Sequence, residues 1–443
     1  MYNDDKKKYN NIMKKVQVTV IGAGPAGVSA AITLAKAGIE VLLVERGDCA
    51  GDKNVFGGTI YAMQTSEIFP EFWKEAPVER AVSSQKIMLL TDDQSTEFLY
   101  RYPIEENYKA FTVNRSKWDK WCVNQAVNSG AYYAPKTLVK ELIVENGFVK
   151  GVRTQFEEFY SDIVIIADGV NSLLAKQIGL RNKFKDSNVT LNVKEVYRLP
   201  KERLQDRFNL KDNEGFAAKI FGGPLKDIFA MGFMYTNKDS VTIGLGITLN
   251  DLVENNYRPF EILEQLKSHP TIAPLIKGGE LKEYSAHLIP EGGYKKIPKL
   301  CGNGVMIIGD AAMLVNNLHW EGTNLAMISG KLAAQTAIEA LNCENYSKKF
   351  LSAYEKNLKN SFIMKDLKTY KDLMNVMHQR KKAFLDYYLR KINSFFEMFT
   401  SVNSIPKKKN YWDFIASLFT DRKISELFKD MWALIKLLWS ILI

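Results

Sequence analysis

The sequence predicts an α/β fold in which a Rossmann-like unit is followed by an antiparallel β-sheet and a helical C-terminal region. Three observations predict it. Residues 16–46, VQVTVIGAGPAGVSAAITLAKAGIEVLLVER, have the pattern of a strand, a glycine turn, a helix and a second strand. Residues 186–296 alternate as β-strands do, with a hairpin expected at TNKDS. Beyond residue 345, apolar residues recur at helical spacing.

Length and composition are those of an ordinary globular protein. At ~150 residues per domain, 443 residues predict about two or three domains. Hydrophobic residues make up 46% and charged residues 25%, which is enough for a core and does not indicate disorder. The charged N-terminus lacks the apolar core of a signal peptide, and no stretch approaches the ~20 apolar residues of a membrane span. Cys49, Cys122, Cys301 and Cys343 are too far apart for metal-ligand spacing, so we expect no metal.

The first strand–turn–helix unit has the spacing of a dinucleotide-binding turn. Gly22, Gly24 and Gly27 form GxGxxG where the helix begins. The first glycine permits the turn, the second lets a pyrophosphate approach the backbone, and the third lets helix and strand pack closely. Glu45 ends the next strand, where a carboxylate can accept hydrogen bonds from ribose hydroxyls. A dinucleotide is therefore predicted, but this unit alone does not decide between NAD and FAD.

Three later segments decide between them. Arg115 lies near the start of a predicted helix in 113–131, and an apolar strand in 159–180 ends at Asp168-Gly169. Another apolar strand, in 304–314, ends at Gly309-Asp310. Together with the glycine turn, these segments resemble the GR2-type FAD-binding domain of aromatic hydroxylases, geranylgeranyl reductases and electron-transfer-flavoprotein:quinone oxidoreductases.

The resemblance implies an FAD site and a role for each segment. It places Arg115 near the FAD phosphates and Asp310 on the ribitol. It also directs the N-terminus of the helix after Gly322 at the flavin, where the positive helix end stabilises negative charge on the reduced ring. The cofactor-binding residues expected on this basis are Gly22, Ala23, Gly24, Pro25, Ala26, Gly27, Glu45, Arg46, Val55, Phe56, Gly57, Gly58, Arg115, Val139, Asp168, Gly169, Asp310, Gly322, Thr323 and Asn324.

The segment before that helix, HWEGTN, holds the expected catalytic residues. Thr323 and Asn324 are candidates for hydrogen-bonding the flavin heteroatoms. His319 and Glu321 could relay a proton to a quinone. Alternatively, His319 is a packed side chain beside an aromatic residue, and Glu321 is an acid favoured by the helix dipole. The same two interpretations, functional and structural, apply to His287.

Three stretches indicate which of these flavoprotein families the sequence resembles most. GDKNVFGGTIY (51–61), YSAHLIPEGGYKKIPKL (284–300) and HWEGTNLAMISG (319–330) look like the FixC-type electron-transfer-flavoprotein:quinone oxidoreductases. The resemblance implies an FAD-dependent enzyme that passes electrons from reduced electron-transfer flavoprotein, with FixA- and FixB-like subunits, to a membrane quinone. No cysteine follows Cys343, so a cluster on this chain is not expected and a separate ferredoxin-like FixX-type subunit is implied.

Other functions remain open at this point. A geranylgeranyl-reductase-like enzyme would reduce prenyl double bonds on the same fold, but the Tyr-x-Trp-x-Phe-Pro type motif of those reductases is absent. A flavin monooxygenase would have no use for a basic amphipathic tail. A subunit that holds FAD only for assembly is a further alternative, from a non-enzymatic class.

These expectations divide the chain into four parts. Residues 16–185 begin the FAD-binding domain, with an inserted β segment at about 86–110. Residues 186–296 form the antiparallel-sheet quinone or substrate domain, 297–345 return to the FAD-binding domain, and 346–443 form the helical region.

The last fifth of the chain is basic and amphipathic. Residues 365–443 hold 15 Lys and Arg against 8 Asp and Glu, which accounts for +7 of the net charge of +10. ISELFKDMWALIKLLWSILI (424–443) places apolar residues on one helical face and most charges on the other, as in helices that lie in a membrane interface. We expect peripheral attachment at the cytoplasmic face of the membrane, with packing on a partner subunit as the alternative. No nucleic-acid-binding fold accompanies the charge, so nucleic acid is not an expected partner.

Overall fold

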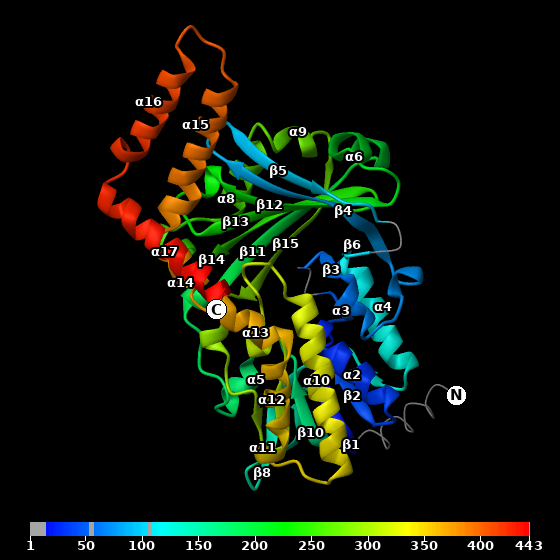
Figure 1. Cartoon of the computed structure of the whole chain (residues 1–443). Coiled ribbons are helices and arrows are strands. Elements are labelled where there is room, and N and C mark those ends of the chain that lie inside the picture. The colour runs from blue at the N-terminus through cyan, green and yellow to red at the C-terminus, as the bar shows by residue number, and fades with distance from the viewer. Residues whose placement is uncertain (1–14, 53–56, 105–107, 443) are drawn as a thin grey trace. The chain divides into compact units, whose positions relative to one another are not determined.

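A computed structural model describes residues 15–52, 57–104 and 108–442 (Figure 1). The chain forms two compact units, each assembled from three separate segments. Unit 1 contains the described residues up to Glu79 together with Lys109–Val189 and His287–Lys368. Unit 2 contains the described residues of Arg80–Tyr108, Thr190–Ala286 and the chain from Thr369 onward.

The core of unit 1 is a mainly parallel sheet in the order β16-β17-β10-β1-β2-β7. Its strands are β1 (Lys15–Ile21), β2 (Val41–Val44), β7 (Tyr132–Ala134), β10 (Glu158–Ile166), β16 (Cys301–Gly302) and β17 (Val305–Ile307). The central strands are rich in branched apolar residues and buried, as expected for a sheet covered on both faces. Strands β8 (Val139–Glu145) and β9 (Phe148–Thr154) extend it antiparallel from β10. Strand β3 (Thr59–Tyr61) pairs antiparallel with β6 (Ala110–Val113), and both belong to the second, nine-stranded sheet.

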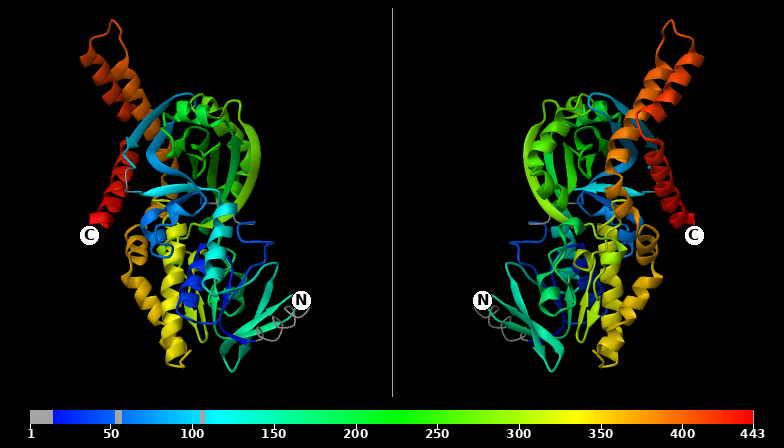
Figure 2. Two further views of the ribbon diagram at one scale, coloured as in Figure 1. Left: turned by 90° about the vertical axis from the view of Figure 1, so that its right-hand side faces the viewer. Right: turned by 90° about the vertical axis from the view of Figure 1, so that its left-hand side faces the viewer.

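Two long helices of unit 1, α2 (Pro25–Lys36) and α10 (Thr323–Asn342), pack side by side on this sheet (Figures 1 and 2). A Cβ at Gly330 would lie 2.2 Å from the carbonyl oxygen of Ala26, so this contact requires glycine. The other helices are α3 (Ala62–Ser66), α4 (Arg115–Asn128), α5 (Leu173–Gln177), α11 (Lys348–Leu351), α12 (Ala353–Asn360) and α13 (Phe362–Thr369), with short 3-10 turns η1 (Phe72–Lys74), η2 (Asp186–Asn188), η4 (Tyr294–Lys296) and η5 (Gly309–Ala312).

Unit 2 is built on a largely antiparallel sheet in the order β15-β11-β14-β13-β12-β4, with β5 paired to β4. Its strands are β4 (Val78–Leu90), β5 (Ser95–Arg101), β11 (Val189–Arg198), β12 (Glu214–Gly222), β13 (Ala230–Thr236), β14 (Ser240–Thr248) and β15 (Glu280–Pro290). β4 runs parallel to β12. Helices α6 (Lys201–Phe208) and α8 (Pro259–Ser268) contribute Leu204, Leu263 and Leu266 to the core on one face of the sheet. The remaining elements before the tail are η3 (Gly223–Leu225), α7 (Leu249–Asn255) and α9 (Ala273–Ile276).

The tail of unit 2 is helical. It consists of α14 (Leu373–Gln379), a π-helical turn η6 (Ala383–Tyr387), α15 (Tyr388–Thr400), α16 (Lys407–Thr420) and α17 (Ile424–Leu442). Helices α15 and α16 run side by side, and α17 follows them (Figures 1 and 2). In the described part of the chain, none of the helices combines the length and the apolar character needed to cross a bilayer.

Candidate cofactor site

The GxGxxG turn of unit 1 lies between β1 and α2, and its three glycines meet different surroundings. Gly22 has φ +105°, and a Cβ there would lie 2.3 Å from the carbonyl oxygen of Ala167. A Cβ at Gly27 would lie 1.9 Å from the carbonyl oxygen of Gly22. A Cβ at Gly24 would meet no described atom within 4 Å. The first and third glycines are therefore required by the fold, whereas the second leaves open backbone, as a pyrophosphate needs.

The N-terminus of α2 faces this open backbone. Gly24 is the N-cap residue and no side chain caps the helix, while Pro25 occupies the first turn. The free first-turn N–H groups and the helix dipole make an anion-binding site here. These features fit a bound pyrophosphate.

Glu45 holds the turn in place with both of its carboxylate oxygens. The backbone N–H of Ala23 donates to Oε2 at 2.9 Å, and that of Gly47 donates to Oε1 at 2.7 Å. Nearby, the N–H of Ala50 donates to the hydroxyl oxygen of Tyr133 at 3.0 Å. Burial and the charge of Glu45 raise the pKa of Tyr133 to about 12, so this hydroxyl is neutral at pH 7. Glu45 thus orders the backbone in addition to the ribose contact predicted for it.

Arg115, the first residue of α4, is paired inside unit 1 with a residue that the sequence analysis did not single out. Its Nε and Nη2 donate to the two carboxylate oxygens of Asp119 at 2.8 and 2.9 Å. Arg115 is 4% exposed and Asp119 is 3% exposed. Burial alone would lower the pKa of Arg115, but Asp119 outweighs burial and raises it, so the guanidinium stays charged. The i, i+4 spacing of an Arg and an Asp was the signal that could have identified this pair.

Three predicted site residues, Gly57, Arg115 and Thr323, lie close together. A Cβ at Gly57 would lie 3.1 Å from Arg115 Nη1 and 3.1 Å from Thr323 Oγ1. Gly57 has φ +86°, a conformation that favours glycine. The structure therefore brings the loop after β2, the start of α4 and the start of α10 to one place, although they are far apart in sequence.

Asp310 lies in the turn η5, which is fixed from two sides. The N–H of Gly309 donates to Ser329 Oγ of α10 at 3.0 Å. The buried Arg181 donates from Nη1 to the carbonyl oxygen of Ala311 at 2.9 Å. Burial raises the pKa of Asp310 to about 6, and the charges of Arg115 and Arg181 oppose that rise. Arg181 was not predicted, because nothing in its local sequence marks it.

The segment before α10 forms a closed loop. Asn316 and Glu321 exchange backbone hydrogen bonds of 2.9 and 3.1 Å, and Trp320 between them has φ +61°. His319 is exposed and Glu321 is half-buried. No side chain caps α10, so its first N–H groups are available to an acceptor, and the prediction that this helix is directed at a flavin stays a prediction.

Two amide side chains of this loop and helix are buried with an unused polar atom. Asn324 is 2% exposed, and its Oδ1 has no hydrogen-bond partner among the described residues. Asn316 is 1% exposed, and the same holds for its Nδ2. Because buried polar atoms are normally satisfied, these atoms fit a bound ring that carries both donors and acceptors, as the flavin pyrimidine does.

The remaining predicted residues lie as follows. Asp168 follows β10 and accepts a hydrogen bond from the N–H of Leu174 at 3.4 Å, and burial raises its pKa. Gly169 has φ +77°. Val139 is buried at the start of β8, and Arg46 is exposed after β2. Gly58 is buried, and its carbonyl accepts a hydrogen bond from the N–H of Val113. Val55 and Phe56 lie outside the described residues.

Asp310→Asn is expected to remove a pH dependence from the stability of the cofactor-free chain. Because the pKa of Asp310 is about 6 in the folded chain, the folded chain keeps this proton between pH about 4 and 6 while the unfolded chain releases it. The stability contributed by Asp310 is therefore fully present below pH about 4 and is lost as the pH rises through about 6. The variant should match the parent at pH 4 and exceed it at pH 7 by up to about 3 kcal/mol.

Urea unfolding of the parent and the variant at a series of pH values measures this difference. His287 adds an effect of opposite sign, because burial first, and then the charges of Arg115 and Arg46, lower its pKa to about 4. Its contribution is present in both proteins and cancels in the difference at each pH. Stability curves that run parallel from pH 4 to 7 would contradict the assignment.

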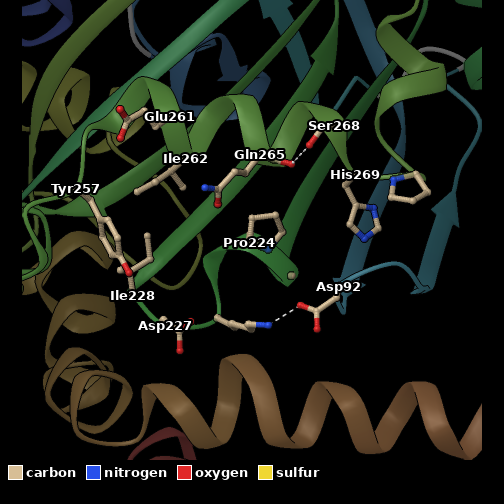
Figure 3. A pocket seen from close by; sticks show the side chains of 13 residues that line it. Asp92, Pro224, Asp227, Ile228, Tyr257, Glu261, Ile262, Gln265, Ser268 and His269 are labelled. Carbon is tan, nitrogen blue, oxygen red and sulfur yellow. Dashed lines mark hydrogen bonds and ion pairs between the residues drawn. The ribbon is translucent and has the colours of Figure 1, made fainter.

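Unit 2 contains a separate pocket of about 500 Å³ beside α8 and η3 (Figure 3). Its lining is largely polar and includes Asp92, Asp227 and Glu261. The ammonium group of Lys226 donates to Asp92 at 2.5 Å, and this bond, followed by one from Arg390, lowers the pKa of Asp92. None of the site residues predicted from the sequence lines this pocket, and its lining of charged side chains of both signs suits a quinone ring poorly.

Comparison with known proteins agrees with the geometry of unit 1. The FAD binding domain family matches residues 15–208, and the family described as ETF-QO, ubiquinone-binding, matches residues 189–289. Protein FixC of Bradyrhizobium diazoefficiens is 40% identical over 425 residues, covering 95% of this chain and 98% of that protein. The chain belongs to the FixC family. A protein of Escherichia coli K12 named probable electron transfer flavoprotein-quinone oxidoreductase YdiS is 38% identical over 390 residues, covering 87% of this chain and 91% of that protein.

Solved structures share the fold. A geranylgeranyl bacteriochlorophyll reductase-like protein of Thermoplasma acidophilum superposes with a TM-score of 0.73 at 19% identity, covering 94% of this chain and 99% of that one. The myxobacterial chondrochloren halogenase CndH, an FAD-dependent halogenase, superposes with a TM-score of 0.64 at 15% identity, covering 93% and 91%. At such identities the likeness concerns the fold alone. The predicted fold class, the FixC-type resemblance and FAD as the cofactor are confirmed, while the roles of the individual site residues stay predictions.

Proposed function

We propose that this chain is an FAD-dependent oxidoreductase that passes electrons from a reduced electron-transfer flavoprotein to a membrane quinone. The observation that carries the proposal is the succession, in one FixC-family chain, of an FAD-binding match over residues 15–208 and a ubiquinone-binding match over residues 189–289. An enzyme that passed electrons only to a protein partner would not need the ubiquinone-binding region. The prenyl-reductase alternative is supported only by a fold likeness at 19% identity.

In this function the bound FAD supplies the acceptance and release of electrons, and the residues of the chain hold and tune it. The open backbone at Gly24 and the uncapped start of α2 hold the pyrophosphate, and Arg115 adds a positive charge. Thr323 and Asn324, at the uncapped start of α10, orient the ring through hydrogen bonds. The side chains of the protein need not form covalent bonds with the substrate, because the flavin carries the electrons. His319 is exposed and is the better placed of the two proton-relay candidates to exchange protons with water.

The partners that we propose follow from the FixC family. The electron donor is an electron-transfer flavoprotein with FixA- and FixB-like subunits. A separate ferredoxin-like subunit of FixX type carries the iron–sulfur cluster, because the four cysteines of this chain, Cys49, Cys122, Cys301 and Cys343, are free and dispersed along the sequence.

The function is tested by anaerobic mixing. The FAD-loaded chain is mixed with chemically reduced electron-transfer flavoprotein, with the ferredoxin-like subunit present, and flavin absorbance is followed. We expect the flavin of the chain to be reduced, and then to be reoxidised rapidly by a short-chain quinone but slowly by oxygen. Rapid reoxidation by oxygen with no response to the quinone would favour a monooxygenase instead.

We also propose that the tail of unit 2 lies on the membrane surface. Many large apolar side chains of α15–α17 are exposed, among them Phe395, Phe396, Phe399, Trp412, Ile415, Phe419, Phe428, Trp432, Leu438 and Trp439. Asp430 of α17, by contrast, is fully buried and accepts a hydrogen bond from Arg422 Nε at 2.7 Å. Lys407, Lys408 and Lys409 begin α16. Exposed aromatic and aliphatic side chains near basic residues suit the interface of an anionic membrane.

Replacing Trp412, Trp432 and Trp439 with Glu is expected to lower the binding of the FAD-loaded chain to anionic vesicles roughly tenfold or more, because apolar burial is replaced by repelled charge. Co-sedimentation with vesicles of phosphatidylglycerol and phosphatidylethanolamine measures it. Phe156→Glu is a single-site control, since Phe156 is an exposed aromatic residue outside the tail. Equal sedimentation of the triple variant and the control would show that the tail packs on a partner protein instead.

A further inference from the structure

A strip of lysines on unit 1 takes no part in the site described above. It consists of Lys176, Lys183, Lys185, Lys295, Lys296 and Lys299, called here the basic strip. All are exposed except Lys176, which is half-buried. Residues 173–188 and 292–300, which carry these lysines, contain a single acid, Asp186. Positive charges at this density repel one another, and an oppositely charged partner that binds to them lowers this repulsion.

The two segments of the basic strip are joined into one surface. The N–H of Lys299 donates to the carbonyl oxygen of Leu180 at 3.2 Å, and the N–H of Glu291 donates to that of Asn188 at 2.7 Å. Within the first segment, burial and then the charges of Arg181 and Lys183 lower the pKa of Lys176, while the charge of Asp168 opposes them. The two backbone hydrogen bonds therefore place the two lysine-bearing segments next to each other.

The basic strip is attached directly to the turn that carries Asp310. Arg181, between Lys176 and Lys183, donates to the carbonyl oxygen of Ala311 at 2.9 Å. A Cβ at Gly292 would lie 2.5 Å from Lys296 Cβ and 2.9 Å from Met313 Cε. Asn317 Nδ2 donates to the carbonyl oxygen of Glu291 at 3.0 Å, which joins the strip to the loop before α10. A protein bound at the strip would thus lie beside the cofactor site, where short distances favour electron transfer.

We propose that the basic strip docks the acidic face of the electron-carrying protein that reduces this chain. The proposal rests on the proposed function and adds to it the place and the chemistry of the docking contact. Complementary charge steers encounter and raises association rates, which suits a partner that must bind and leave in each turnover. A lipid surface is the less suitable occupant, because the segments of the strip expose only Leu173 as a large apolar side chain, whereas the tail of unit 2 exposes many aromatic residues.

The test reverses charge on the strip. Lys183→Glu, Lys185→Glu and Lys299→Glu are combined in one FAD-loaded variant. The matched control combines Lys140→Glu, Lys356→Glu and Lys359→Glu, which are exposed lysines of unit 1 outside the strip and give the same change in net charge. Stopped-flow absorbance measures the second-order rate constant for reduction by electron-transfer flavoprotein, with its ferredoxin-like subunit, over a range of ionic strength. Reduction by dithionite reports whether the flavin itself is unaffected.

We expect the strip variant to react at least about tenfold more slowly at low ionic strength, with the difference shrinking at high salt, while the control variant and the dithionite rates stay close to the parent. Equal donor rates for the two variants, while the parent is reduced normally, would overturn the docking proposal and leave the proposed function intact. Loss of vesicle binding in the strip variant with an unchanged donor rate would assign the strip to lipid. A parent that the donor does not reduce at any salt concentration would overturn the proposed function and the docking proposal together.

Discussion

Gly24→Ala is expected to give a chain that folds as well as the parent but binds FAD about 100-fold more weakly or worse. The backbone of Gly24 has φ −77°, which any residue adopts, and a new Cβ would meet no described atom within 4 Å. The methyl group would instead fill the open backbone where the pyrophosphate approaches, and would hold it away from the free N–H groups of α2. A 100-fold loss corresponds to about 2.7 kcal/mol of binding free energy.

Gly27→Ala is the contrasting variant. Its Cβ would lie 1.9 Å from the carbonyl oxygen of Gly22, so α2 would have to move away from β1. This variant should be destabilised even without FAD, and its loss of FAD should follow from its loss of structure. The pair therefore separates binding from folding at two positions only three residues apart.

The measurement is fluorescence titration of the FAD-free proteins with FAD, together with their thermal unfolding. We expect Gly24→Ala to unfold within about 2 °C of the parent without FAD, since the added methyl group would meet no described atom within 4 Å and such a substitution changes stability by less than about 0.5 kcal/mol. A Gly24→Ala chain that binds FAD as tightly as the parent would show that the cofactor does not approach this backbone.

The site residues expected from the sequence are those whose chemistry is local, and their roles stay predictions. The glycine turn is recognised from the spacing of Gly22, Gly24 and Gly27, which lie within six residues of one another. The start of the later helix is recognised from Gly322-Thr323, which come directly before its apolar residues. The partners Asp119 and Arg181 were not predicted, because their roles depend on contacts made only after folding. Glu45 was predicted for the ribose, but its two hydrogen bonds to the backbone were not.

The fold was predictable to a similar degree. Period-2 patterns identified the sheet of unit 2, and helical spacing identified the tail. The parallel pairing of β4 with β12 was not foreseen, because it joins residues more than a hundred positions apart and strand patterns do not encode which strands become neighbours. For the same reason, the sequence did not predict that the described residues of Arg80–Tyr108 belong to unit 2.

Asp119→Ala is expected to destabilise the FAD-free chain by about 3–5 kcal/mol. The buried guanidinium of Arg115 would lose the carboxylate that accepts from its Nε and Nη2, and an uncompensated buried charge is costly. With saturating FAD the loss should be smaller, because the negative phosphates would then face the same guanidinium. Urea unfolding with and without FAD measures both quantities. Glu158→Ala, which breaks the exposed pair with Arg153, is the control and should cause no measurable loss.

A double variant decides whether the charge itself is the cause. Arg115→Leu combined with Asp119→Leu removes both charges, and replacing a buried ion pair with apolar residues is often neutral for stability. The double variant should therefore unfold at a higher urea concentration than Asp119→Ala alone, although it should bind FAD weakly because Arg115 is gone. If the double variant were less stable than the single one, packing around α4 rather than an unpaired charge would account for the loss. In that case, Arg115 would serve to hold α4 in place, and its approach to the FAD phosphates would need separate evidence.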